Sequence, residues 1–107
     1  MRPMLPLLAL LFATASVTWA SADDLQIARG RTFARVNCGQ CHAIGPQGDS
    51  PMAEAPPFRD LQKRYPVDDL ARPLTEGILT GHPSMPAFRL YRDQVNDLIA
   101  YIKSLAR

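Results

Sequence analysis

The chain has 107 residues, which is enough for a single domain at most, and its formal net charge is +2 at pH 7. Loss of an N-terminal leader containing Arg2 would reduce this charge to +1. Three arginines lie within residues 29–35, but two aspartates precede them, which is typical of a solvated helix face. The charge pattern therefore gives no support for nucleic-acid binding.

The first 22 residues have the pattern of a secretory signal peptide. Arg2 supplies the positive start, residues 5–17 are almost wholly apolar, and small residues follow. We expect cleavage after Ala22, because Ala20 and Ala22 fit the A-x-A pattern, with cleavage after Ala20 as the alternative. An uncleaved anchor is disfavoured, since the apolar run is shorter than the roughly 20 residues that span a bilayer. The sequence thus predicts export, with residues 1–22 as leader and residues 23–107 as one domain.

Residues 24–37 are predicted to form the first helix of this domain. Asp23 and Asp24 provide a cap and negative charge at its start, and small and apolar residues follow at helical spacing. Gly30 costs about 1 kcal/mol relative to alanine inside a helix. Close packing of this position against another helix is the expected reason for a glycine.

A Cys-x-x-Cys-His motif follows at Cys38, Cys41 and His42, and it is the attachment pattern of c-type haem. Each thiol can add across a porphyrin vinyl group, which holds the next residue's imidazole within reach of the iron. The chain has no other cysteines. A disulfide would close too short a loop to stabilise an 85-residue domain appreciably, whereas a covalent haem supplies the cofactor that so small a core often needs.

The middle of the chain is predicted to contain short elements and two loops. Residues 45–57 are rich in glycine and proline and indicate an irregular loop. A short helix is expected over residues 58–65, and a second one over residues 73–79, preceded by a turn and ended by Gly81. Residues 82–90, with two prolines, form the second loop.

Residues 92–105 give the clearest helix. Its apolar residues fall at spacings of 3, 1, 3 and 3 and form a single stripe, at Val95, Leu98, Ile99, Ile102 and Leu105. No segment has a strong strand pattern. The fold is therefore predicted to be all-α.

An iron held by His42 needs a ligand on its other side, and the candidates after the leader are few. Met85 lies 43 residues downstream, between a serine and a proline in the second loop, and has the reach to cross the far face. Met52, ten residues past His42, is not expected to reach it. His82 is the competitor, and it would lower the reduction potential relative to methionine. Met85 is the predicted sixth ligand.

Two other uses of these cysteines have to be weighed. A structural zinc site could combine both thiols with His42 and His82, but three of these four ligands crowd into one turn. A thiol–disulfide oxidoreductase is not supported, since no βαβ pattern surrounds the motif. Metal analysis and the visible colour of the protein separate zinc from haem.

Over residues 24–105 the chain resembles the small single-haem class I cytochromes c. The resemblance rests on residues in the family's order: Gly30 eight residues before the first cysteine, Ala55-Pro56-Pro57-Phe58-Arg59-Asp60-Leu61 after the haem motif, Met85-Pro86, and Tyr101-Ile102 in the last helix. Ala34 and Asp60 depart from the pattern, and Phe33 is expected to fill the space of the aromatic that the family commonly has at position 34.

The resemblance implies a cytochrome c fold, in which the first and last helices cross where Gly30 lets Tyr101 approach. It implies one covalent haem c on Cys38 and Cys41, and axial iron ligands His42 and Met85. It also implies that the carbonyl of Pro56, or that of Pro57, accepts a hydrogen bond from His42 and fixes its tautomer. We also expect six apolar side chains to form the wall of the haem pocket: Phe58, Leu61, Leu79, Phe88, Leu98 and Ile102.

The expected function is that of a periplasmic electron carrier rather than an enzyme, exchanging single electrons with a redox protein donor and acceptor. We expect a monomer without stable membrane insertion once the leader is cleaved. The alternatives are a haem subunit of a larger oxidoreductase and a ligand-binding haem protein with a labile sixth ligand.

Overall fold

The structure is a computed structural model that describes residues 1–4, 10–77 and 84–106. Its elements in chain order are α1 (Ala22–Asn37), the 3₁₀ helices η1 (Phe58–Lys63) and η2 (Val67–Leu70), α2 (Ala71–Glu76) and α3 (Arg92–Ser104). Within the described ranges there is no strand, which confirms the all-α prediction.

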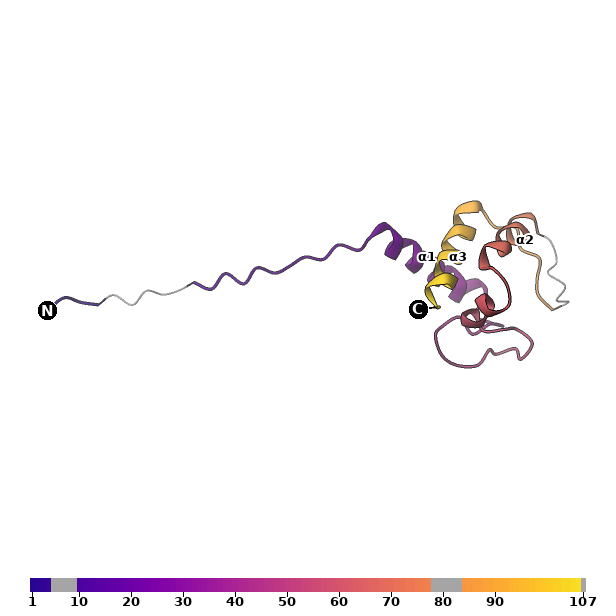
Figure 1. The fold of residues 1–107 in the computed structure, drawn as a ribbon, viewed down its shortest axis with the longest axis horizontal. Coiled ribbons are helices and arrows are strands. Elements are labelled where there is room, and N and C mark those ends of the chain that lie inside the picture. The colour runs from indigo at the N-terminus through magenta and orange to yellow at the C-terminus, as the bar shows by residue number, and fades with distance from the viewer. Residues whose placement is uncertain (5–9, 78–83, 107) are drawn as a thin grey trace.

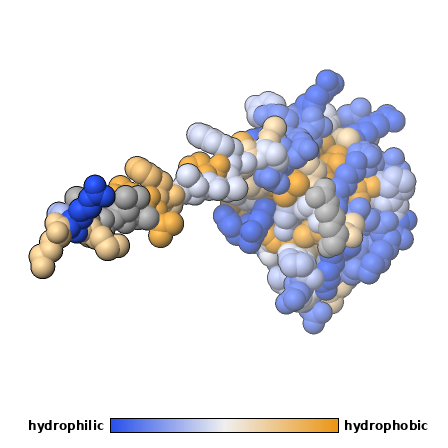
Figure 2. All heavy atoms as spheres, turned by 60° about the vertical axis from the view of Figure 1, so that its left-hand side comes forward, coloured by the Kyte–Doolittle hydropathy of each residue, from blue (hydrophilic) through white to orange (hydrophobic). Residues whose placement is uncertain are grey.

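The described residues before α1 lack regular secondary structure and extend away from the helical domain (Figure 1). Apolar side chains are exposed along this leader, as the space-filling view shows (Figure 2). Among the described residues, none of the helices combines the length and apolarity needed to cross a bilayer.

α1 begins two residues earlier than the sequence predicted, because Ser21 caps it. The Ser21 hydroxyl accepts a hydrogen bond from the Asp24 backbone N–H at 3.1 Å, and the Asp24 carboxylate accepts the Ser21 N–H at 3.4 Å. This reciprocal pair is a capping box. At the other end of α1, the backbone N–H groups of Cys38 and Gly39 both donate to the Ala34 carbonyl.

α1 and α3 cross at Gly30, and the crossing organises the domain (Figure 1). A Cβ at Gly30 would lie 2.0 Å from the Asp97 carbonyl oxygen and 2.8 Å from the Tyr101 Cβ. Only glycine therefore allows this approach. The Tyr101 hydroxyl continues past the crossing and donates to the Ile44 carbonyl at 2.6 Å.

The apolar stripe predicted for the last helix forms the centre of the core. Val95, Leu98, Ile99 and Ile102 are all buried, and Leu105 packs against them. Since these side chains lie on one face of α3, the opposite face is left to solvent.

The short elements close the domain around α3. η1 is held to it by the Gln62 side chain, whose Nε2 donates to the Ile102 carbonyl at 2.9 Å. α2 is tied to the segment before α3, because the Leu90 N–H donates to the Leu74 carbonyl at 2.8 Å.

α2 differs from the predicted helix over residues 73–79. It starts at Ala71, so Pro73 falls within the first turn, where a missing N–H is tolerated. It ends at Gly77, which adopts a left-handed conformation with φ of 72°. The predicted breaker, Gly81, lies outside the described residues.

Candidate functional site

A cavity of about 660 Å³ opens between the C-terminal end of α1, η1, α2, α3 and the segment that precedes α3. Its volume is within the range of roughly 300–1,000 Å³ usual for ligand pockets. The predicted haem-site residues Cys38, Cys41, His42, Pro56 and Met85 all line it. The structure thus brings together side chains from two distant parts of the sequence.

The Cys-x-x-Cys-His motif continues the chain from α1 as a single turn. The N–H groups of Cys41 and His42 both donate to the Cys38 carbonyl, at 3.2 and 3.0 Å. Both cysteines are free and half-buried. This turn presents two thiols and one imidazole to the same cavity.

Burial raises the pKa of the Cys38 thiol to about 11, with a smaller contribution from the neighbouring Cys41. In the absence of a cofactor, Cys38 is therefore a protonated thiol at neutral pH. A thiol in this form behaves as a small apolar group, in keeping with the walls around it.

A hydrogen bond to the Pro56 backbone orients the imidazole of His42. Its Nδ1 lies 2.7 Å from the Pro56 carbonyl oxygen, which can only accept, so Nδ1 carries the proton. The other ring nitrogen then keeps its lone pair for a metal. The Phe58 ring packs beside the imidazole at a centroid distance of 5.1 Å and a tilt of 51°.

The loop between His42 and η1 is shaped by three hydrogen bonds that bring Pro56 to this position. The Ala43 N–H donates to the Ser50 hydroxyl, and the Met52 N–H donates to the Cys41 carbonyl. The Phe58 N–H donates to the Ala43 carbonyl at 2.9 Å. Each bond links the loop to residues next to His42, so the loop folds back over the motif.

This return also places Met52 among the cavity-lining residues, together with Met85. The spacing of ten residues from His42 predicted that Met52 would not reach the far face of the haem. Spacing alone does not show that the loop folds back towards His42. Both methionines are half-buried. The competitor His82 lies outside the described residues.

The walls of the cavity are largely apolar. Of the six residues predicted for the wall, five line the cavity: Phe58, Leu61, Phe88, Leu98 and Ile102. The sixth, Leu79, lies outside the described residues. Ala34 is fully buried, and the adjacent Phe33 packs against the core and lines the cavity.

Several lining residues were not predicted: Tyr65, Leu70, Pro73 and Leu74. They come from η1, η2 and α2 or the turns between them. The spacing of four between Leu70 and Leu74 places both on one helical face and could have revealed them. η2 itself was expected to be only a turn.

These features fit an iron porphyrin better than a bare metal ion. The apolar walls suit a flat apolar ring, and a nitrogen and a thioether sulfur are available as iron ligands. Over the described ranges, no cluster of three or more His, Cys, Asp or Glu could hold a metal ion by itself. The His82 that a zinc site would require is outside those ranges.

Comparison with known proteins gives a consistent result. A family model described as Cytochrome c matches residues 27–106. A cytochrome c-552 from Bradyrhizobium diazoefficiens is 32% identical over 98 residues, which cover 92% of this chain and 91% of that protein.

A second relative is the cytochrome c subunit of a cytochrome bc1 complex from Corynebacterium diphtheriae. It is 34% identical over 87 residues, which cover 77% of this chain but only 28% of that protein. No solved structure gives a significant match.

Proposed function

Because the chain belongs to the cytochrome c family, whose members hold haem c covalently and carry electrons, we propose that it is a periplasmic single-haem electron carrier with His42 and Met85 as axial iron ligands. One observation carries the proposal: Cys38, Cys41, His42 and Met85 all line one apolar cavity. The cofactor, when bound, supplies a one-electron iron couple.

The two cysteines are the residues that attach the cofactor. Each would form a thioether by adding its sulfur and hydrogen across one vinyl group, which would anchor the haem to the turn that ends α1. The hydrogen bonds of Cys41 and His42 to the Cys38 carbonyl fix the spacing of this turn. Attachment thereby holds His42 in position to bind the iron.

His42 and Met85 are the proposed axial ligands. The Pro56 carbonyl holds the proton on Nδ1 of His42, which leaves Nε2 available to iron and increases its basicity. Met85 lines the cavity from the segment before α3, and its thioether would be the second ligand. Methionine ligation favours the ferrous state and raises the reduction potential relative to two histidines.

The apolar walls have a second role in setting the potential. They exclude water, and a low dielectric disfavours the additional positive charge of the ferric state. Iron held by both His42 and Met85 would have no open position for a substrate. With both ligands held by the fold, little reorganisation accompanies electron transfer, and weak, short-lived docking is sufficient for exchange.

The periplasmic location rests on the leader. Arg2, the apolar run of residues 5–17 and the small residues up to Ala22 together support export and cleavage. Apart from Ser21 and Ala22 at the start of α1, the described leader residues lack regular structure (Figure 1), in keeping with a removable segment.

A second candidate function is that of a haem subunit within a larger oxidoreductase. The Corynebacterium relative favours it, because its name places it in a bc1 complex. The c-552 relative favours the free carrier, because its length is almost fully covered by this chain. Isolation of the exported protein, free or bound to other subunits, separates the two.

The test of the ligand set uses the two methionines of the cavity as a matched pair. In the natively exported holoprotein, Met85→Ala is expected to abolish the ferric absorption band near the red end of the spectrum that reports sulfur on iron. It should also lower the reduction potential and allow the ferrous protein to bind carbon monoxide at once. Met52→Ala should retain the band and exclude carbon monoxide.

Other results would reassign the sixth ligand. Loss of the band in Met52→Ala alone would make Met52 the ligand, whereas a wild-type spectrum that lacks the band and is unchanged in Met85→Ala would favour His82. His42→Ala is expected to prevent maturation of holoprotein altogether. A colourless exported product lacking the added mass of haem would overturn the proposed function.

A further inference from the structure

α1 carries an apolar stripe that the core does not use. Leu25, Ala28, Thr32 and Val36 follow one another at spacings of 3, 4 and 4, which places them on one face of the helix. Leu25 is 52% exposed and Val36 is 66% exposed, although both are large and apolar. Neither side chain belongs to the hydrophobic core.

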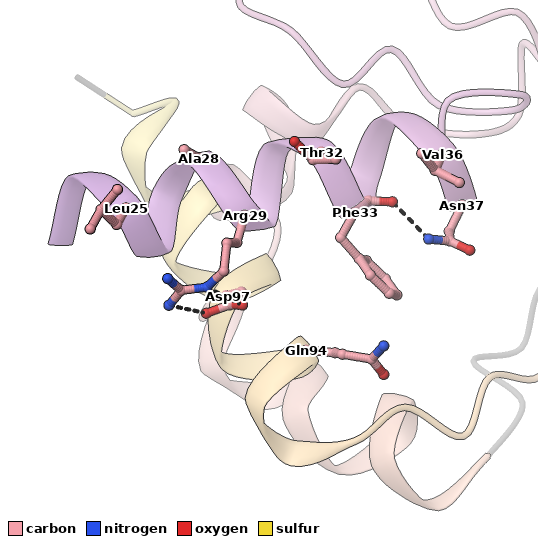
Figure 3. A pocket seen from close by; sticks show the side chains of 9 residues that line it. All are labelled: Leu25, Ala28, Arg29, Thr32, Phe33, Val36, Asn37, Gln94 and Asp97. Atoms are coloured by element: carbon pink, nitrogen blue, oxygen red, sulfur yellow. Dashed lines mark hydrogen bonds and ion pairs between the residues drawn. The ribbon is translucent and has the colours of Figure 1, made fainter. Parts of the chain in front are cut away.

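The stripe borders a shallow groove of about 750 Å³ between α1 and α3. Figure 3 shows Arg29 and Phe33 pointing from α1 towards α3, where Arg29 pairs with Asp97 at 3.0 Å. In the same view Thr32 and Val36 do not point towards α3, although both line the groove. The contacts between α1 and α3 thus leave the stripe uncovered.

Charged residues flank the stripe on one edge of α1, namely Asp24, Arg31 and Arg35. Asp24 and Arg35 lie eleven residues apart, at nearly the same angle around the helix, near opposite ends of α1. Both side chains are exposed. Like the apolar residues, these two charges share one edge of the helix.

We propose that this face of α1 docks on the same face of a second copy of the chain, with the two helices antiparallel about a twofold axis. In that arrangement Leu25 of one copy meets Val36 of the other at both ends of the contact. The small side chains of Ala28 and Thr32 meet at the centre and let the helices approach closely.

Charge complementarity selects a second copy over an unrelated partner. A twofold axis perpendicular to antiparallel helices keeps each edge on its own side, so Asp24 of one copy lies beside Arg35 of the other. The symmetry repeats this pair at the other end.

The contact is short and supports only weak association. A single helix face is small compared with the roughly 1,200–2,000 Å² buried in stable complexes. The protein therefore remains monomeric when dilute, as the sequence analysis expected, and pairs only at high concentration. Phe33 and Asn37 line both the groove and the haem cavity, so the second copy docks beside the cavity.

The first experiment measures sedimentation velocity of the natively exported holoprotein from micromolar to millimolar concentration. The sedimentation coefficient of the wild type should rise with concentration. Val36→Lys should reduce the association constant by roughly tenfold or more, which corresponds to a loss of at least about 1.4 kcal/mol. Lysine near a helix C-terminus does not disturb the helix itself.

Asn96→Lys is the matched control, because it adds the same charge at an exposed position of α3 outside the groove. It should associate like the wild type. A wild type that stays monomeric throughout, or a dimer that Val36→Lys leaves intact, would overturn the proposal. So would a protein that binds only a different periplasmic protein on this face.

A charge exchange tests the antiparallel register. Arg35→Asp should weaken association, and addition of Asp24→Arg should restore it, because the exchanged charges again face each other. Far-UV circular dichroism verifies that α1 is intact in each variant. If the double variant stays weak with an intact helix, the proposed register is wrong. The result does not depend on which residue is the sixth ligand.

Discussion

The crossing of α1 and α3 and the cavity beside it are built in different ways. At the crossing, the polypeptide provides its own contacts: Gly30 lies against the Asp97 carbonyl, and the Tyr101 hydroxyl bonds to the Ile44 carbonyl. Around the cavity, apolar side chains from short helices and loops face a space of about 660 Å³. Side chains that face such a space obtain packing partners from the group that fills it.

This difference indicates that the two regions depend on different components. The crossing is specified by residues that fit one another, whereas the cavity walls rely on the haem for their packing. Changes at the crossing should therefore affect stability directly, and changes in cofactor attachment should act first on the walls. The following predictions test this division, from the largest effect to the smallest.

The largest effect is expected on removal of the cofactor. A double variant, Cys38→Ala with Cys41→Ala, cannot form the thioethers and should lose cooperative unfolding, because net stabilities are only about 5–15 kcal/mol. Near-UV circular dichroism should flatten. Amide exchange should be fast over residues 43–77 and 84–90, with the slowest amides left in α1 and α3. Protected amides around the cavity would contradict the division.

A change at the crossing itself should be the next largest. Gly30→Ala places a Cβ 2.0 Å from the Asp97 carbonyl oxygen and should reduce the free energy of unfolding by about 3 kcal/mol or more. Gly45→Ala is the control, since its Cβ would meet nothing within 4 Å. Chemical denaturation of the holoprotein measures both. Equal effects from the two substitutions would show that the crossing is not tightly packed.

Tyr101→Phe should lower the free energy of unfolding by about 1 kcal/mol at neutral pH, through loss of the hydrogen bond to Ile44. Burial raises the pKa of Tyr101, an effect that Arg31 partly offsets. The folded state therefore holds the proton more tightly. The stability contributed by the hydroxyl is complete below the ordinary pKa of about 10 and is lost as pH rises through the folded-state pKa.

The measurement is a denaturation series from neutral to alkaline pH. The advantage of the wild type over Tyr101→Phe should shrink as pH rises above about 10. Tyr65→Phe serves as the control, because burial also raises the pKa of Tyr65. In Tyr65→Phe, the free energy of unfolding should still decrease at alkaline pH because Tyr101 ionises. A constant difference between wild type and Tyr101→Phe would contradict the prediction.

The smallest effect is expected at the surface. Lys103 on α3 bonds to both carboxylate oxygens of Asp68 in η2, but the two side chains are 49% and 69% exposed. A double-mutant cycle with Lys103→Gln and Asp68→Asn should give a coupling of about 0.5 kcal/mol or less. The coupling should vanish at high salt. A larger, salt-resistant value would mean that η2 is held to α3 mainly by this pair.

The two long helices could be predicted from the sequence because their determinants are local. The stripe of α3 repeats at helical spacing, and each of its first four members is buried. Gly30 predicted a close approach of α1 to another helix, although the sequence does not identify the contact with Asp97. α1 starts two residues before the predicted position, because the helix is capped by the Ser21 hydroxyl as well as by the charge of the two aspartates.

The short elements were harder to predict because tertiary contacts set their limits. The expected helix over residues 58–65 is a 3₁₀ helix, Phe58–Lys63, and η2 was expected to be only a turn. α2 ends where Gly77 turns left-handed beside the Arg89 side chain. No periodicity in the sequence reports that contact.

The candidate site divides in the same way. The motif at residues 38–42 identifies the two cysteines and the histidine of the site from the sequence alone. Most of the predicted apolar wall also lines the cavity. The position of Met52 could not be predicted, because it depends on three hydrogen bonds that fold the loop back over His42. Spacing along the chain gives reach, but it does not give the path of a loop.

Ser21, which caps α1, lies on the leader side of the expected cleavage site after Ala22. If peptidase cuts after Ala22, the hydroxyl is discarded with the leader and a newly made ammonium group arises at the positive end of the helix dipole. Asp23 and Asp24 then become the residues that neutralise this group. The start of α1 is thus stabilised by a capping box in the precursor and by acidic side chains beside the new ammonium group in the cleaved protein.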